Sequence, residues 1–467
     1  MRLLLLSLMI TAAYGQQFDV VLRGGRVMDP ESRLDAVRDV GIVGGHIAAI
    51  SETPLRGKSE IDARGLVVAP GFIDLHSHGQ DPENYAYKAR DGVTTALEME
   101  IGVYPVASWY AERQGHARVN FGATAGHVRA RMAVMHDTGV WLPKDEAQKK
   151  ASAAQVDATL SAVRQGLSEG ALGIGLGIAY VPGASRPEIL QMFQLAASEK
   201  VGVFVHMRDA GPVEPGVVDA TQEVLADALV SGAPLHIVHI TSMGMRQTGL
   251  LLEMIEAARR RGVDVSTEAY PYTAGSTALD SAVFNPGWQE RLGIGYGDLQ
   301  WVATGERLTA ETFAKYRAQG GIVVIHSIPE DVVRLALRNP LVMIASDGFL
   351  TNGKGHPRSA GCYARVLGYY AREEKVLPLM EALRRMTLMP AQRLEAAVPQ
   401  MRQKGRIKVG ADADITVFDA ATVRDRATFE QPALYSTGIP YVLVNGVVVV
   451  RNGELVKDAA PGVAIRR

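Results

Sequence analysis

Short apolar runs recur through the middle of the chain, each closed by a polar or glycine-containing turn and followed by a helical pattern. The helical pattern is clearest at residues 187–200 and 248–262. This alternation favours βα units and a parallel sheet. Eight or so units over roughly 300 residues predict a closed (β/α)₈ barrel rather than an open sheet. The candidate strands lie at 71–76, 93–100, 120–127, 171–177, 202–207, 235–240, 264–270, 321–326 and 342–347.

The two ends of the chain have a different pattern. Residues 18–29 and 37–50 alternate as short strands broken by Gly-Gly turns, and residues 404–419 and 441–456 are equally β-rich. Asn445-Gly446 is a hairpin signal. The sequence therefore predicts an α/β protein in which a TIM-type barrel at 69–404 carries a small β-sandwich domain, built from residues 16–68 and 405–467 together.

The first residues are typical of a secretory signal peptide, with Arg2, an apolar run at 3–13 and small residues at Ala13 and Gly15. We expect residues 1–15 to be such a peptide and the protein to be secreted or periplasmic. No later stretch stays apolar for about 18 residues, so no membrane span is expected. The single cysteine, Cys362, permits no internal disulfide.

Composition and charge narrow the classes of partner. The 467 residues are 47% hydrophobic and 21% charged, an ordinary globular balance. A formal net charge of −1 gives no electrostatic reason to expect nucleic acid or an anionic membrane surface as partner. A small molecule is the expected ligand, and the oligomeric state is left open.

Residues that bind metals close several of the predicted strands. His76 and His78 follow the first strand, His206 and His239 end two later ones, and Asp347 ends the last. Catalytic residues of such barrels lie at the carboxyl ends of the strands, so these five side chains are expected to meet there. Imidazole together with carboxylate suits Zn²⁺ and similar divalent ions. Taken singly, each of these residues is more often structural; the set as a whole favours a metal site.

The second strand adds two carboxylates. Glu98 and Glu100 lie on one face of an otherwise apolar strand, where a charge costs several kcal/mol unless it is paired or binds metal. Spacing does not choose between them. Glu100 is favoured as a ligand because it is nearer the strand end, and pairing of either with Arg129 or Arg208 is the structural alternative.

With these residues in view, the chain resembles the amidohydrolase superfamily, and within it the D-aminoacylase branch. The motifs that carry this resemblance run in order from about residue 18 to 455 and include "APGFIDLHSH", "GALGIGLGIAYVPG", "HMRD", "HIVHITSMG", "YPYTAGST" and "SDGFLTNGKGHPRSAG". The resemblance implies a metal-dependent hydrolase of N-acyl-D-amino acids. It also implies the barrel with a β-sandwich that the pattern predicts independently.

The resemblance assigns roles residue by residue. It implies one or two Zn²⁺ ions held by His76, His78, His206 and His239, with Asp347 also at the metal. Asp347 would take a proton from the metal-activated water and pass it to the leaving nitrogen, as general base and then general acid. The substrate carries a carboxylate, and its binding residues would be Arg358, Tyr272, Ser276 and Tyr180.

Two departures from the family pattern bear on the substrate and the metals. The family's cysteine ligand on the second strand is replaced by Glu98 or Glu100, which leaves the number of metal ions open. The family's lysine two residues after the sixth-strand histidine is replaced by Thr241. Loss of that cation could move the preferred substrate from simple N-acyl-D-amino acids to a D-dipeptide or another amide.

Two other functions remain as alternatives. The first is a cyclic amidase that resembles dihydropyrimidinase or hydantoinase, but residues 171–180 lack the strand-four lysine of those enzymes. The second is a barrel that binds metal or ligand without catalysis, which the intact set of ligands and Asp347 disfavours. The substrate, the D/L preference and the native metal are not determined by the sequence.

Overall fold

The computed structural model describes residues 18–467, and the expected signal peptide at 1–15 lies outside them. Eight parallel strands form one sheet in the order β16-β12-β11-β10-β9-β8-β7-β6. A parallel bridge between Ser77 and Gly348 joins the segments that follow the first and last of these strands and closes the barrel. The predicted fold class is confirmed. The strands are β6(Phe72–Asp74), β7(Val93–Val103), β8(Asn120–Gly126), β9(Gly173–Gly177), β10(Gly202–His206), β11(Leu235–Ile237), β12(Val265–Ala269) and β16(Val342–Ile344).

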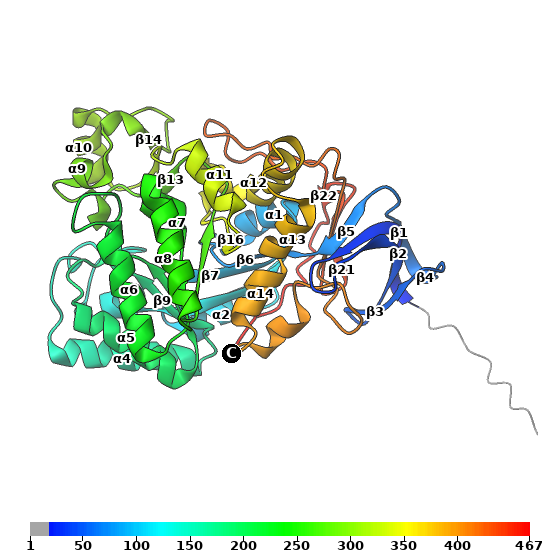
Figure 1. Cartoon of the computed structure of the whole chain (residues 1–467), viewed down its shortest axis with the longest axis horizontal. Helices are drawn as coiled ribbons and strands as arrows, with labels where there is room; N and C mark the ends of the chain where they lie inside the picture. The colour runs from blue at the N-terminus through cyan, green and yellow to red at the C-terminus, as the bar shows by residue number, and fades with distance from the viewer. Residues whose placement is uncertain (1–17) are drawn as a thin grey trace, which may run out of the picture.

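Helices cover the outside of the barrel, coloured cyan to orange in Figure 1. In α5 the N-cap Ser185 accepts a hydrogen bond from the backbone N–H of Glu188, and Lys200 ends the helix in the left-handed conformation. Its buried side chains, among them Ile189 and Phe193, pack in the main core. The α-helices are α1(Pro82–Arg90), α2(Val106–Arg113), α3(His127–Met135), α4(Ala153–Ser168), α5(Arg186–Glu199), α6(Val217–Ser231), α7(Ile240–Gly244), α8(Thr248–Arg260), α11(Glu330–Arg338), α12(Arg358–Arg365), α13(Leu379–Met386) and α14(Leu388–Leu394).

The β domain lies at the right of Figure 1 and draws on both ends of the chain. Its strands form one connected sheet in the order β22-β21-β20-β19-β5-β1-β2-β3, with β4 paired to β1. The two ends meet where β5 pairs with β1 on one side and with β19 on the other. The strands are β1(Phe18–Asp29), β2(Leu34–Val43), β3(His46–Ser51), β4(Gly57–Asp62), β5(Val67–Pro70), β19(Ile415–Phe418), β20(Tyr441–Val444), β21(Val447–Arg451) and β22(Glu454–Leu455).

The last residues of the chain leave the β domain and return to the barrel. The backbone N–H of Ile465 donates to the carbonyl of Phe121 at the start of β8, over 2.7 Å. The buried Ile465 side chain packs with Leu97, Leu172 and other barrel residues. The end of the chain therefore covers the side of the barrel opposite the carboxyl ends of the strands.

One of the predicted barrel strands belongs elsewhere. Residues 321–326 contain β15(Ile322–Ile325), which pairs with β13(Gly275–Ala278) and β14(Leu299–Trp301) in a separate antiparallel sheet. An apolar strand has the same sequence pattern in either sheet, because the pattern reports burial and not the partner strand. This sheet, with α9(Trp288–Leu292) and α10(Ala310–Gln319), forms an insert between β12 and β16 at the upper left of Figure 1.

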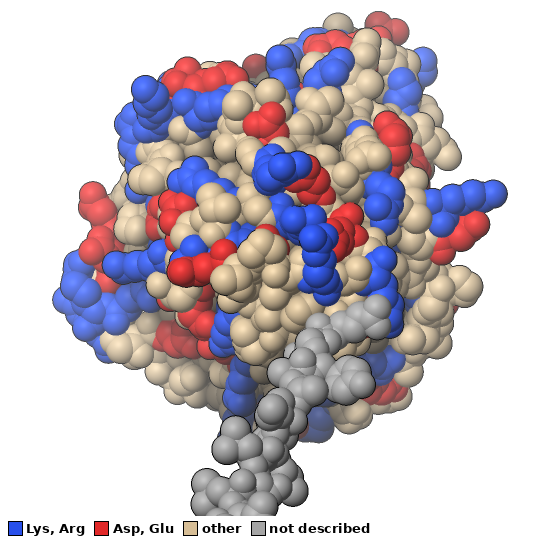
Figure 2. All heavy atoms as spheres, turned by 90° about the vertical axis from the view of Figure 1, so that its right-hand side faces the viewer, with Lys and Arg blue, Asp and Glu red and all other residues tan. Residues whose placement is uncertain are grey.

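The described structure offers no membrane-spanning helix. No helix of residues 18–467 is both long and apolar enough to cross a membrane. Figure 2 shows lysine and arginine interspersed with aspartate and glutamate on the face that the β domain presents. The short elements are η1(Ile178–Tyr180), η2(Met245–Gln247), η3(Ala282–Phe284), η4(Tyr296–Asp298), η5(Val366–Glu373), η6(Pro399–Gln403), β17(Leu350–Thr351) and β18(Lys354–Gly355).

Candidate metal centre and active site

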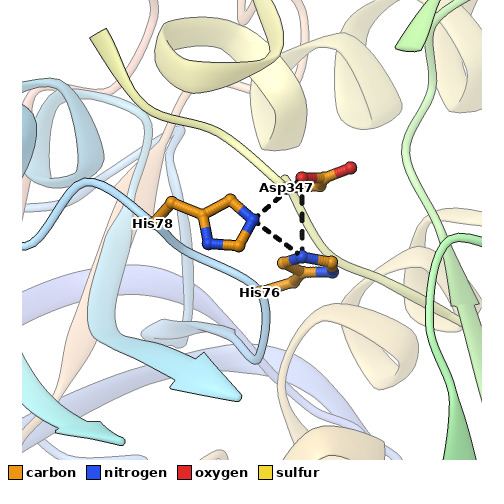
Figure 3. Close-up of side chains that lie close together, drawn as sticks. All are labelled: His76, His78 and Asp347. Atoms are coloured by element: carbon orange, nitrogen blue, oxygen red, sulfur yellow. Dashed lines mark hydrogen bonds and ion pairs between the residues drawn. The ribbon is translucent and has the colours of Figure 1, made fainter. Parts of the chain in front are cut away.

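The strand-end residues singled out by the sequence meet at the carboxyl end of the barrel. His76 and His78 follow β6, Glu100 lies within β7, and Asp347 follows β16. Figure 3 shows the two histidine rings and the Asp347 carboxylate pointing toward one another. The two remaining histidines come from neighbouring strands: His206 ends β10, and His239 is the N-cap residue of α7, two residues after β11.

A first group of side-chain atoms lies together: His76, His78 and Asp347 offer ligand atoms within 4.8 Å of one another, and Glu100 Oε2 adjoins both histidines. His76 Nε2 lies 3.2 Å from His78 Nε2, 3.3 Å from Glu100 Oε2 and 3.4 Å from Asp347 Oδ1. His78 Nε2 lies 3.2 Å from the same Glu100 atom and 3.3 Å from the same Asp347 atom. Tetrahedral zinc with bonds of about 2.0–2.1 Å has neighbouring ligand atoms about 3.3–3.4 Å apart. The geometry of the first group therefore fits a zinc ion.

A second group shares Glu100 with the first. Glu100 Oε1 lies 2.6 Å from His206 Nδ1 and 2.9 Å from His239 Nε2, and these two nitrogens are 3.0 Å apart. One oxygen of Glu100 thus faces each pair of histidines. The distances within this second group are hydrogen-bond distances, shorter than the spacing of ligands around one ion. Glu100 also offers a ligand atom within 4.8 Å of one from His76 and one from His239, so its carboxylate is available to a second metal ion.

The sequence left open whether Glu98 or Glu100 faces the histidine nitrogens, and the structure separates the two. Glu98 Oε2 lies 2.7 Å from Nδ1 of His78, on the side of the ring away from the first group. Neither arginine of the structural alternative forms an ion pair with these carboxylates. Arg208 pairs with Glu223, and Arg129 donates to the carbonyls of Val140 and Trp141. Glu98 is placed to orient His78.

The excess of negative charge at the centre also favours binding of a cation. The carboxylates of Glu98, Glu100, Glu268 and Asp347 are buried together, and the one cation in contact with them within residues 18–467 is Arg358. Burial lowers the pKa of His76, but the carboxylates of Asp347, Glu100 and Glu268 outweigh it and raise this pKa to about 10. Divalent ions bound by neutral histidines would offset this excess of negative charge.

Glu268 is a residue of the candidate centre that the sequence reasoning missed. It lies on β12, where Oε1 is 2.6 Å from Nδ1 of His76 and Oε2 is 3.0 Å from Nε2 of His236. Burial raises the pKa of Glu268, but the two histidines outweigh it and lower this pKa to about 2, so the carboxylate is ionised. It therefore fixes the ring of His76 with Nε2 toward the first group. The available signal was a glutamate within an apolar strand, as for Glu98 and Glu100.

Replacing Glu268 by Gln should weaken metal binding without removing a residue of either group. A carboxylate that accepts the second N–H of a ligating histidine typically changes metal affinity or activity by about 10- to 100-fold. We expect a loss of that size in zinc affinity, measured by competition with a chelator. Equal zinc affinities for the variant and the wild-type protein would contradict the orienting role.

Two backbone positions at the centre are strained. His239 has φ of 33° and Asp347 has φ of 51°, although neither is glycine. Strained non-glycine residues concentrate at active sites, where surrounding contacts hold them. At Asp347 the backbone N–H donates to the carbonyl of His76 over 2.7 Å, which fixes the two residues relative to each other.

A buried polar cluster supports the junction of the first and last strands. Lys88 Nζ donates to Asp74 Oδ2 over 2.8 Å and to Ser346 Oγ over 2.5 Å. Asp74 also accepts the backbone N–H of His76 and of Ser346. The residues beside Asp347 and His76 are therefore fixed by a network in which Lys88 neutralises Asp74.

A cavity of about 630 Å³ opens onto the centre, where His206, His239 and Asp347 line it. Tyr180 and Ser276, two of the predicted substrate residues, also line this cavity. The structure places Tyr272 outside it, with the hydroxyl directed at the carbonyl of Pro357. The tyrosine of the same motif that lines the cavity is Tyr270, two residues earlier. Strand parity alone leaves both tyrosines on one face, so the motif did not separate them.

Arg358 lies behind the cavity wall rather than along it. Its Nη1 is 2.9 Å from Asp347 Oδ2, and its guanidinium lies over the Tyr270 ring at 4.4 Å. The hydroxyl of Tyr270 is buried without a hydrogen-bond partner among the residues described. Burial raises the pKa of Tyr270 to about 12, so this hydroxyl is a donor at neutral pH.

A barrel with histidines and carboxylates gathered at its strand ends defines a metal-dependent hydrolase. The chain belongs to the amidohydrolase family, which matches residues 59–450, and the resemblance drawn from the sequence is confirmed. D-aminoacylase from Alcaligenes xylosoxydans xylosoxydans is 32% identical over 93% of this chain and 95% of its own.

Solved structures give the same result. N-acyl-D-glutamate deacylase from Bordetella bronchiseptica, complexed with zinc and a phosphonate inhibitor, is 29% identical with a TM-score of 0.83, over 97% of this chain and 100% of that one. A D-aminoacylase studied for the role of its binuclear metal center is 28% identical with a TM-score of 0.82, over 96% of this chain and 100% of that one.

Proposed function

We propose that the protein is a zinc-dependent deacylase that hydrolyses the amide bond of N-acyl-D-amino acids and related D-amino-acid amides. The observation that carries the proposal is the pair of histidine groups that share Glu100 at the mouth of the cavity. The similarity to a D-aminoacylase and to an N-acyl-D-glutamate deacylase supports the substrate class.

One or two divalent ions would be held by the two groups. His76, His78, Asp347 and one oxygen of Glu100 provide the first site. His206, His239 and the other oxygen of Glu100 provide the second. A Zn²⁺ ion there would lower the pKa of a water molecule to about 7 and polarise the amide carbonyl.

Asp347 is positioned to move the proton. Burial raises the pKa of Asp347, but Arg358 and His76 outweigh it and hold this pKa below its ordinary value, so the group is a carboxylate at neutral pH. It lines the cavity between the centre and the substrate space. It would accept a proton from the attacking water at a carboxylate oxygen and deliver it to the leaving nitrogen.

The substrate carboxylate would be recognised next to Asp347. The guanidinium of Arg358 lies behind the cavity wall and supplies a fixed positive charge to this region through its pair with Asp347, and its Nη2 donates to the carbonyl of Ser276 over 3.4 Å. The Tyr270 side chain lines the same part of the cavity, and its hydroxyl is a buried donor. Thr241, in place of the family's lysine, adds no charge. These groups select an anionic leaving part.

A comparison of enantiomers tests the proposal. Zinc content and hydrolysis should be measured on one preparation, with N-acetyl-D-leucine and N-acetyl-L-leucine as paired substrates. We expect one or two zinc equivalents, hydrolysis of the D-enantiomer only, and loss of activity after treatment with a chelator. Stoichiometric zinc with no turnover of either substrate would contradict the deacylase assignment.

The cyclic-amidase alternative gains no support from the cavity. Within the part of the chain that the structure describes, its lining includes no lysine. Linear amides therefore remain the proposed substrates. A hydantoin substrate, turned over faster than any N-acyl-D-amino acid, would reverse this conclusion.

We also propose that residues 1–15 direct export. The charged, apolar and small residues in that order support this proposal. Expression of the full chain in a bacterium, followed by cell fractionation and N-terminal sequencing, provides the test. An uncleaved N-terminus in the cytoplasmic fraction would contradict it.

A further inference from the structure

Four side chains with formal charge line the cavity, and two of them have no ion-pair partner. Asp347 pairs with Arg358, and Arg208 holds Glu223 in a two-point ion pair of 2.9 and 2.6 Å. The other two are Asp209 and Arg291. Within residues 18–467, Asp209 accepts no hydrogen bond and lies within 4 Å of no cationic group.

Arg291 does not supply the missing partner. Its guanidinium donates to the carbonyls of Pro286 over 3.1 Å and Val283 over 3.2 Å, which hold it in the wall of the insert. The carboxylate of Asp209 is therefore left facing the cavity. Burial raises the pKa of Asp209, and the positive charges of Arg208 and Arg291 offset this rise only in part.

Contacts on both sides of Asp209 fix the backbone that carries it. Asp209 follows His206 by three residues, on the connection from β10 to α6. Arg208 anchors one side by donating to the carbonyl of Ala184 over 2.9 Å. On the other side the backbone N–H of Gly211 donates to the carbonyl of Met243 over 3.0 Å. The backbone at Gly211 is packed closely against the insert, because a Cβ there would lie 2.2 Å from the carbonyl oxygen of Arg291. Asp209 is thus preorganised at the same rim as a metal-binding histidine.

We propose that Asp209 binds the free ammonium group of an aminoacyl substrate. The substrates would be dipeptides whose carboxyl-terminal residue is a D-amino acid. Water adds across their amide bond, and two free amino acids leave. This inference rests on the proposed function and specifies the acyl part of its substrate.

Chemistry on both sides of the scissile bond favours this substrate class. In a dipeptide the ammonium is one carbon from the scissile carbonyl, and the carboxylate lies one carbon beyond the scissile nitrogen. The ammonium would pair with the half-buried carboxylate of Asp209 by a charge-assisted hydrogen bond.

Two substrates that differ only in the ammonium provide the test. L-Alanyl-D-leucine carries it, and N-propionyl-D-leucine has hydrogen in its place. The measured quantity is the ratio of their kcat/KM values for the zinc-loaded enzyme. We expect the wild-type protein to prefer the alanyl compound, and Asp209→Asn to lower the ratio by about 10- to 100-fold, since a hydrogen bond to a charged group is lost.

The controls separate this inference from the proposed function. Glu214→Gln removes one negative charge from an exposed position of the same loop and should leave the ratio unchanged. Asp209→Ser provides a second variant should Asp209→Asn fail to fold. An unchanged ratio in the Asp209 variants, or hydrolysis of the propionyl compound alone, would overturn the inference and leave the deacylase proposal standing. Turnover of neither compound by the wild-type protein would overturn both.

Discussion

Replacing Asp347 by Asn should lower kcat by about 10²- to 10⁴-fold, the usual contribution of a positioned general acid–base. The amide oxygen of Asn can still face Nε2 of His76 and His78, where Asp347 Oδ1 lies 3.4 and 3.3 Å away. An amide cannot accept the proton that the carboxylate would take. The loss should therefore appear in turnover more than in zinc content, and both should be measured on the same preparation.

A matched control uses an aspartate of the insert. Asp280 is exposed and does not line the cavity, so Asp280→Asn should keep wild-type kcat on N-acetyl-D-leucine. If Asp347→Asn retained more than a tenth of the wild-type kcat, the proton-transfer role would be wrong. If its zinc content fell in proportion to activity, Asp347 would act as a ligand only.

Replacing Glu100 by Gln should have the largest effect on metal binding. Glu100 is the residue that offers one oxygen to each pair of histidines, and an amide offers only one oxygen to a metal. We expect the zinc content to fall by at least one equivalent relative to a two-zinc wild-type protein, or to be lost from a one-zinc protein. Elemental analysis after dialysis against dilute zinc gives the measurement.

Glu98→Gln is the matched control for Glu100→Gln. The two glutamates occupy the same strand, two residues apart, and both are buried. Glu98 contacts His78 through Nδ1, so its loss should weaken zinc affinity by about 10- to 100-fold without changing the number of sites. A Glu98 variant that loses a zinc equivalent, beside a Glu100 variant that does not, would reverse the assignment.

Local pattern was sufficient for the architecture. Alternating βα units predicted the barrel, and β-rich ends predicted a domain shared by both termini. The nine-stranded sheet joins β5 to both β1 and β19. Pattern failed for the strand at 321–326, because apolar side chains report that a strand is buried and not which sheet buries it.

The position of residues at strand ends also predicted most members of the candidate metal centre. Histidine and aspartate after apolar runs are visible in the sequence, and the barrel geometry brings strand ends together. Three assignments needed coordinates. Glu98 contacts Nδ1 of His78, whereas Glu100 contacts Nε2. Tyr270 rather than Tyr272 lines the cavity. Glu268 contacts His76 from a strand that lies far away in the sequence.

The sequence by itself determined the fold class, the amidohydrolase resemblance and the set of residues at the strand ends, since these depend on local periodicity and on residue type. Only the tertiary structure decided which atoms of those residues face one another, that Glu100 is shared between two groups, and that Asp209 faces the cavity without a partner. The physical reason is that hydrogen bonds and ion pairs act over about 3 Å between residues separated by many positions, and no local pattern encodes those distances.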